Sequence, residues 1–445
     1  MKIKKQFDSI QDNERGMVLV VVLLLTAALI ILGTTAVMQT STDLKIGSNY
    51  KTSTQAFYDA DAGVQYVLKK LADDLDDSNS STVNLSASPA SPISLNYSTP
   101  SGFSFTPPSV LTPVTGTTDQ YSFSVTGHGP NNSSEATIEI VLSAEPKSVF
   151  DYGLFADGLV DLKAGAELYS YDSSVTPDPD PATFPGASTG EADIGSNTKV
   201  ITKMDTYVDG DLALGADDSD PPVNAEWTET EETTKATING EAGTTVGRVD
   251  PDPLGANDPT SELYDKFIDI VTTNNNATDK MGAACPLAGA TDINLSSGET
   301  ITLTAGDYYI TSIILKNASI LEIDATNGPV NIYLNGIVDA EDGELEAKNG
   351  SAINNLSDPT DFSIFSNSDQ DIVFKHDSAF KGTIYAPNAD VQLNNSAGVY
   401  GLIWGKTVGI NNGGGFYFDE AIKDKFLSPT DYTVELDSWK DESID

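Results

Sequence analysis

The chain of 445 residues carries 66 acidic against 24 basic residues, a net charge of −42, and its length favours two or three structural units. Its only arginines are Arg15 and Arg248, and the charge balance excludes binding to duplex or single-stranded nucleic acid, which needs a basic surface. A single cysteine, Cys285, excludes an internal disulfide and a cysteine-based zinc site.

An apolar run at residues 16–38 follows a short leader that contains basic side chains. At roughly 1.5 Å per residue, a helix from Met17 to Gly33 would cross most of the ~30 Å hydrocarbon core of a bilayer. The positive charges ahead of it leave residues 1–16 in the cytoplasm and export the rest of the chain. A cleaved signal peptide has a shorter apolar region, so we expect this segment to be retained as an anchor or a packing element.

This order of features resembles the N-terminus of type IV prepilins. In that family a peptidase cuts on the cytoplasmic side of the apolar segment, after a glycine, and the new N-terminus is methylated. The resemblance implies that a prepilin peptidase removes leader 1–16 by cutting after Gly16, and that Met17 is N-methylated. A plain single-pass anchor that begins with a chance glycine is the alternative.

The segment from Gly47 to Gly63 is similar to the one that closes the N-terminal module of PilX-type minor pilins. In that family an asparagine is followed by an alanine–aromatic pair and an Ala-acid-Ala-Gly stretch. The matching residues are Asn49, Ala56, Phe57, Ala60, Asp61, Ala62 and Gly63. Asp61 stands where the family usually has glutamate. Apolar residues continue at helical spacing to Leu71, so we expect one long helix over residues 17–72, with its membrane part at about 17–38.

The fifth position after the predicted cut is Val21, where major pilins carry a glutamate that is thought to meet a neighbouring subunit's charged N-terminus. The apolar run has no ionisable side chain, and an unpaired carboxylate in lipid would be costly. Through the resemblance, Val21 favours a minor, tip-proximal subunit that packs against other pilin subunits through its helix. The type II secretion tip subunit also lacks this glutamate.

Residues 73–145 are predicted to contain a linker and a small antiparallel element. Residues 121–126 and 136–142 alternate between apolar and polar, and the turn-forming residues 127–132 lie between them. This pattern predicts a β-hairpin. A long helix followed by a small antiparallel sheet is the plan of a pilin.

Short apolar strands recur at about 20 residues within a domain predicted over 146–425. Ile364, Ile384 and Ile403 are spaced by 20 and 19 residues, and asparagine pairs occupy equivalent positions after the last two. This repeat predicts a parallel β-solenoid, in which stacked coils bury a common core. A jelly roll or a sandwich is the alternative.

One similar coil lies near residue 153, far from the others in the sequence. We therefore expect an acidic insertion at about 216–290, with a helix that starts after Asp258. Residues 426–445 are predicted to be a C-terminal tail at the last coil.

Asn367, Asp369 and Asp371 alternate oxygen donors as a calcium loop would, but they lack the glycine and distal glutamate of an EF-hand. Solvated turns are the alternative, and His376 is interpreted as a turn residue. No other cofactor is predicted. No pair of carboxylates stands out by its spacing, and a negative chain suits anionic sugars poorly, so we do not expect an enzyme.

The predicted fold class is therefore α+β, with a long transmembrane helix, a small antiparallel element and a mostly-β domain. The hypothesis is a minor, tip-located type IV pilin-like subunit whose acidic head serves adhesion or aggregation on a surface or glycan ligand. The precursor would lie in the inner membrane, with its N-terminus cytoplasmic and its bulk periplasmic, before it reaches the pilus at the cell surface. Two alternatives stay open, a membrane-tethered β-solenoid enzyme acting on polysaccharides and a type II secretion pseudopilin.

Overall fold

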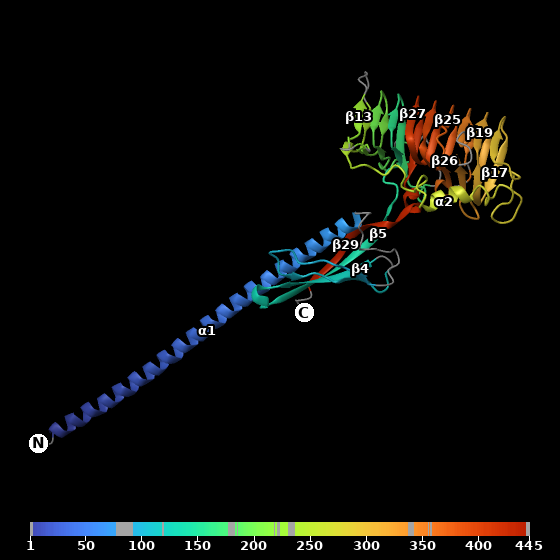
Figure 1. Cartoon of the computed structure of the whole chain (residues 1–445). Coiled ribbons are helices and arrows are strands. Elements are labelled where there is room, and N and C mark those ends of the chain that lie inside the picture. The colour runs from blue at the N-terminus through green and yellow to red at the C-terminus, as the bar shows by residue number, and fades with distance from the viewer. Residues whose placement is uncertain are drawn as a thin grey trace. The chain divides into compact units, whose positions relative to one another are not determined.

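The computed structural model describes residues 3–76, 92–117, 120–176, 183–184, 186–217, 219, 223–229, 236–336, 342–354, 356 and 358–441. The chain divides into two compact units. The first, which we call the helix–sheet unit, consists of Met1–Lys147 and Ser428–Asp445, and the second, which we call the head, is Ser148–Leu427 (Figure 1).

A single helix, α1 (Ile3–Asp76), makes up the first part of the helix–sheet unit. No proline interrupts it, and leucine, alanine and valine dominate its apolar part. At 1.5 Å per residue, its 74 residues span about 110 Å. The predicted long helix is thus confirmed, and it continues one turn beyond the expected end.

An antiparallel sheet packs on the C-terminal part of α1. Its strands follow the order β1-β3-β4-β5-β29, and β2 pairs with β4. Their bounds are β1 Ile93–Ser94, β2 Phe105–Thr106, β3 Val110–Pro113, β4 Gln120–His128, β5 Glu135–Ser148 and β29 Leu427–Asp441. The predicted hairpin is the β4–β5 pair, with Tyr121 opposite Leu142 and Val125 opposite Ile138.

The prediction that residues 426–445 form a tail at the last coil is wrong, because residues 427–441 form strand β29 beside β5. Asp437 ties this strand to the sheet by accepting hydrogen bonds from the Gln120 amide (2.8 Å) and the Ser143 hydroxyl (2.5 Å). Its exposed, mostly polar residues near the C-terminus hid the strand in the sequence.

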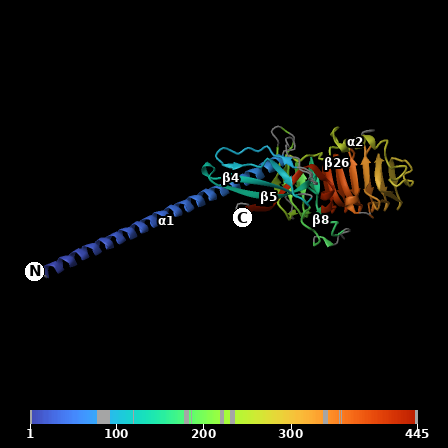
Figure 2. The ribbon, with the colours of Figure 1, turned by 90° about the horizontal axis from the view of Figure 1, so that it is seen from below.

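The head is built from strands that pair in parallel along three ladders, which we call faces A, B and C. Figure 2 shows strands of successive coils side by side in the head. Face A runs through β16 (Asp292–Leu295), β19 (Ser312–Lys316), β22 (Glu344–Lys348), β25 (Ile372–Lys375), the C-terminal parts of β26 (Ala379–Asn394) and β27 (Gly398–Asn411), β7 (Leu159–Leu162), β10 (Lys199–Thr202) and β13 (Glu226–Glu229).

Face B runs through β17 (Thr300–Thr304), β20 (Ile320–Asp324), β23 (Ala352–Ile353), the N-terminal parts of β26 and β27, β28 (Gly415–Asp419), β8 (Glu167–Tyr171), β11 (Tyr207–Val208) and β14 (Thr237–Ile238). Face C runs through β18 (Gly306–Ile310), β21 (Val330–Leu334), β24 (Phe362–Ser366), the middle of β26 and β27, β6 (Leu154–Ala156), β9 (Ile194–Ser196), β12 (Leu212–Leu214) and β15 (Ala242–Thr245).

The sequence repeat maps onto these ladders. Ile364 pairs with Ile384, and Ile384 with Ile403, on face C. The predicted mostly-β domain is confirmed as a large parallel sheet, whereas a jelly roll or sandwich would need antiparallel pairing. The strands alternate buried and outward side chains, so the three faces enclose one apolar core.

Asparagines stack at the corner between faces A and B. Asn317, Asn349, Asn395 and Asn412 have φ between 52° and 57°, a left-handed conformation that asparagine tolerates. His376 lies in the same corner with φ 54°. Its Nδ1 is 3.5 Å from the Asn395 amide nitrogen, and the Asn412 amide donates to Asn395 at 3.2 Å. His376 is therefore placed in a turn.

The coils are not stacked in chain order. The chain enters the stack in its middle, where β6 and β7 pair with β27 and the Val149 amide donates to the Phe426 carbonyl at 2.7 Å. From there residues 154–245 wind toward one end of the stack. Residues 292–419 wind from the other end back to the middle.

The predicted insertion at 216–290 is only partly outside the stack. Strands β13 to β15 pair in parallel with β10 to β12, so these three strands belong to the stack of coils. The remainder contains helix α2 (Glu262–Asp269). Its N-cap is Ser261, whose hydroxyl accepts from the Tyr264 amide, and not Asp258 as the sequence suggested.

Face C is covered by this remaining segment and by residues near both ends of the head. Outward-facing aromatic rings line the face: Tyr309, Tyr333, Phe365, Tyr385, Trp404 and Phe155. Phe267 of α2 packs edge-on against Tyr333 at 5.7 Å, and Phe150 lies 5.0 Å from Trp404. The Trp404 indole donates to the Pro251 carbonyl at 2.9 Å. This layer forms a second apolar core outside the coils.

Candidate functional site

The predicted processing residues lie within α1. Gly16 and Met17 are consecutive helical residues, and Val21 is 55% exposed one turn further on. Among the residues that the structure describes, one helix is long and apolar enough to cross a membrane, with a mean hydropathy of 2.9 in its most apolar part. None of the side chains from Met17 to Met38 is ionisable.

The few polar side chains of this apolar part bond to the helix itself. The hydroxyls of Thr26 and Thr35 donate to carbonyls four residues earlier, at 2.7 and 2.8 Å, and that of Thr34 to one three residues earlier at 2.9 Å. A hydroxyl satisfied within its own helix lowers the cost of placing the residue in lipid. This part of α1 is therefore suited to a bilayer or to packing among other helices.

The PilX-like motif forms a close contact between α1 and β4. Ala56 and Ala60 are fully buried, and they face Gly127 of β4. A methyl group at Gly127 would collide with the Ala56 carbonyl and the Ala60 amide. One turn along the helix, a methyl group at Gly63 would lie 2.6 Å from a methyl of Val125. The small residues of the motif thus let the helix backbone approach the sheet directly.

The other motif residues lie around this contact. Asn49 and Asp61 are exposed, and Ala62 is half-buried. The half-buried ring of Phe57 lies 6.4 Å from the ring of Trp439 in β29. The structure therefore gives Ala56, Ala60 and Gly63 a packing role and leaves Asn49 and Asp61 on the surface.

The partner of this motif was not predicted from the sequence. Gly127 and His128 were predicted to lie in a turn, whereas both belong to β4, and the turn begins at Gly129. The signal was available, because a glycine after an alternating strand often marks a place where another backbone approaches.

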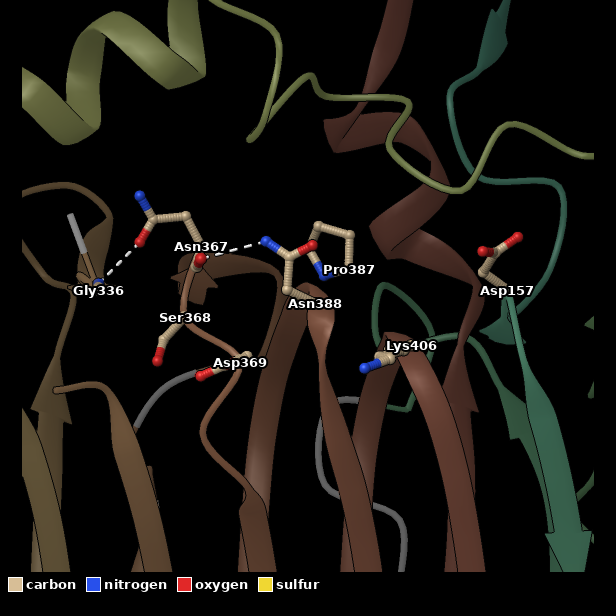
Figure 3. Close-up of a pocket in the computed structure, with 8 residues that line it drawn as sticks. All are labelled: Asp157, Gly336, Asn367, Ser368, Asp369, Pro387, Asn388 and Lys406. Atoms are coloured by element: carbon tan, nitrogen blue, oxygen red, sulfur yellow. Dashed lines mark hydrogen bonds between the residues drawn. The ribbon is translucent and has the colours of Figure 1, made fainter. Parts of the chain in front are cut away.

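A polar groove of about 440 Å³ opens on the head between faces C and A (Figure 3). Asn367 and Asn388 lie on one side, where the Asn388 amide donates to the Asn367 carbonyl at 3.1 Å. Lys406 and Asp157 lie toward the other side. Asp157 accepts hydrogen bonds from Asn197 (2.9 Å) and Arg248 (3.2 Å), so its carboxylate helps to hold the corner of the coil.

The three residues predicted to bind calcium are not gathered around one cavity. Asn367 and Asp369 line the groove, whereas Asp371, together with Asp369, lines a trough on face A. The Asn367 side-chain oxygen already accepts from the Gly336 amide at 2.9 Å. Among the described residues, no group of three or more His, Cys, Asp or Glu side chains is placed to hold a metal ion. Calcium binding stays a prediction from the sequence.

Two ionisable groups with shifted pKa values, the buried Asp419 and the half-buried Lys425, lie after the last coils. Asp419 is fully buried and accepts from the Ser173 amide at 2.9 Å, and burial raises the pKa of its carboxyl to about 6. Burial lowers the pKa of the Lys425 ammonium to about 8, although the nearby Asp361 opposes this shift. Burial also raises the pKa of the free Cys285 thiol, which favours its protonated and unreactive form.

Comparison with protein families gives two matches. Residues 15–65 match the PilX N-terminal family, which covers the predicted cleavage site and the motif that packs on β4. Residues 254–425 match a domain of unknown function, DUF7305. The chain therefore begins with the N-terminal module of PilX-type, type IV pilin-like proteins and continues into a large C-terminal domain. The resemblance stated from the sequence is confirmed.

Comparison with curated proteins finds no match. Among solved structures, the chain is similar to the competence-associated pilin ComZ from Thermus thermophilus, with a TM-score of 0.31 and 12% identity over 88% of this chain and 97% of that one. It is also similar to an ice-binding protein from the Antarctic ascomycete Antarctomyces psychrotrophicus (TM-score 0.31, 12% identity, 62% and 98% covered). A third is the ice-binding protein LeIBP from an Arctic yeast (0.28, 14%, 61% and 91%).

Proposed function

We propose that the chain is a minor subunit of a type IV pilus, placed sparsely or at the tip, that displays the head for adhesion or aggregation. The observation that carries the proposal is the division of α1. The part from Met17 to Met38 is apolar, exposed and free of ionisable groups, and the later part is fixed to a sheet through Ala56, Ala60 and Gly63. Such a helix suits a membrane precursor whose apolar part later packs among the helices of other subunits.

The minor position is supported by Val21 and by the size of the head. Val21 offers no carboxylate for a neighbouring subunit's charged N-terminus. The head alone spans Ser148–Leu427, a bulk that would be hard to place at every step of a slender fibre. The precursor would reside in the inner membrane with its leader in the cytoplasm, where a prepilin peptidase cuts after Gly16.

We also propose that the head acts by binding and not by catalysis. The hydrogen bonds that Asp157 accepts from Asn197 and Arg248 support this view, because they engage the carboxylate in holding the polar groove together. A surface or a glycan is the ligand that we propose for the head.

The test is mass spectrometry of the N-terminus in sheared surface filaments, with and without the prepilin peptidase. We expect a chain that starts at N-methylated Met17, and that disappears from the filaments when the peptidase is absent. Counting copies against the major subunit in the same samples tests the minor position, for which we expect a small fraction. A chain that still begins at Met1 and stays in the inner membrane would refute the proposal.

A further inference from the structure

The outward side chains of face A are exposed or half-buried, in contrast to those of the covered face C. Its strands alternate buried and outward side chains, as in β22, where Leu345 and Ala347 point into the core and Glu346 points outward. Because the strands are parallel and in register, equivalent outward residues line up in columns along the stack. The chemistry of face A can therefore be described column by column.

On β22, β25 and β26, most charges of face A lie at its two edges, whereas on β10 Lys199 occupies the edge that is acidic elsewhere. The edge where the strands begin carries the carboxylates of Glu344, Asp371 and Asp390, which occupy equivalent positions on β22, β25 and β26. The edge where the strands end carries the lysines 316, 348 and 375, which pair directly in register. The two edges are about 13 Å apart, four residues at ~3.3 Å each.

The lysines of this edge are partly neutralised within the head. Glu346, in the column between the edges, lies 2.6 Å from the ammonium of Lys348 and 3.3 Å from that of Lys375. The lysine side chains remain 28% and 36% exposed, so both can make a second ionic contact. On this part of face A, positive and negative side chains are nearly equal in number, whereas the whole chain has a net charge of −42.

A trough of about 400 Å³ lies next to the acidic edge. Glu344, Asp369 and Asp371 provide carboxylates around it, and Ile314 and Val373 provide apolar side chains. A trough with these two kinds of lining suits the methylene stem and the ammonium group of a lysine side chain.

We propose that face A is the contact surface between two copies of this chain, related by a twofold axis that runs parallel to the stack. Such a rotation lays the acidic edge of each copy over the lysine edge of the other, at the same level of the stack. Asp371 then meets Lys375 of the second copy, and Glu344 meets Lys348. A twofold axis parallel to the strands would instead lay the acidic edge of one copy over the acidic edge of the other, which favours the first arrangement.

The size of face A is sufficient for a weak, specific contact. The nine strands of the face, at ~4.8 Å spacing, extend over about 38 Å, and five residues of strand cover about 16 Å. The strip therefore measures roughly 600 Å² per copy, or about 1,200 Å² in total, at the lower limit of specific interfaces. Two strongly acidic chains repel one another elsewhere, so a strip of balanced charge is a favourable place for them to meet.

This inference deepens the proposed function, because pairs of heads on different filaments would join the filaments. Its test does not depend on N-terminal processing or on pilus assembly. The full chain is studied in detergent micelles. The double variant D371C/K375C should form covalent dimers on mild oxidation. Within one chain, these two positions are too far apart for a disulfide, whose Cβ atoms lie about 4 Å apart. The matched control is I320C/D324C, whose positions have the same spacing on the exposed side of β20 on face B.

Exchanging the charges provides an independent measurement by sedimentation. We expect the variant K348E/K375E to weaken dimerisation at least tenfold, and E344K/D371K to do the same. An equal mixture of the two variants should form the heterodimer, because the acidic edges of one variant face the basic edges of the other. Variants that had lost their fold could not regain association on mixing. The inference is refuted by equal cross-linking of the face A and face B pairs, or by a mixture that stays as weakly associated as each variant alone. Failure of N-terminal processing in filaments would overturn the proposed function and leave this result unchanged.

Discussion

Replacing Asp419 by asparagine should stabilise the head at neutral and alkaline pH far more than at acidic pH. Asp419 is fully buried, and its pKa rises from an ordinary 3.8 to about 6. The folded head therefore holds this proton more tightly than the unfolded chain does, and stability falls as pH rises through this interval. A shift of about two units, at 1.36 kcal/mol each, corresponds to a loss of about 3 kcal/mol once pH exceeds the folded pKa.

The assay is urea unfolding of the full chain at pH 5 and pH 8, followed by the fluorescence of the buried Trp404. Both values lie above the isoelectric point of about 4.1. Roughly half of the loss has already occurred at pH 5, so D419N should gain about 1.5 kcal/mol more over the wild type at pH 8 than at pH 5. The exposed Asp424 on the same short segment provides the control D424N. An effect of D419N that is the same at both pH values would refute the reasoning.

Two further predictions concern packing. G127A should destabilise the helix–sheet unit by roughly 1–3 kcal/mol, because the added methyl group collides with the backbone of α1. The measurement is unfolding of this unit, followed by the fluorescence of Trp439. G47A, at an open position of α1, should leave that transition unchanged or raise it. Y385F removes the hydrogen bond from Tyr385 to Asp252 and should cost about 1–2 kcal/mol, with faster proteolysis near residue 252 than in wild type. Equal cleavage rates would contradict a role for this bond in holding the segment on face C.

The parts of the fold that the sequence predicts are those governed by local periodicity. Ile364, Ile384 and Ile403 indicated a register that the structure confirms, because stacked coils repeat the same environment. The apolar helix and its motif were likewise predicted from the sequence, because the spacing of small and apolar residues marks the side of the helix that is buried. The motif that contains Ala56 and Ala60 was recognised in the sequence, but its contact with Gly127 was not predicted. The sequence shows the residues of the helix without showing which strand packs against them.

The elements that the sequence did not predict depend on distant partners. Strand β29 carries an exposed, polar end, and only its pairing with β5 makes it a strand. Strands β13 to β15 were not predicted, because Trp227 does not repeat the aliphatic residue that Val200 and Val160 provide at the equivalent position of face A. Spacing along the chain likewise does not show that Asn367 lines the groove and Asp371 the trough, and calcium binding stays a prediction.

The chain enters and leaves the head in the middle of the stack, and this position determines how the head can fold and how it responds to a pulling force. During synthesis, residues 154–245 emerge long before β27, the strand that pairs with β6 and β7. Contacts between residues so far apart in the chain close slowly, so the two halves of the stack must meet after most of the head has been synthesised. Once joined, Val149 and Phe426 are bonded to each other. A pull on the two ends of the head is therefore taken up at that junction, and the coils toward both tips of the stack stay free of strain.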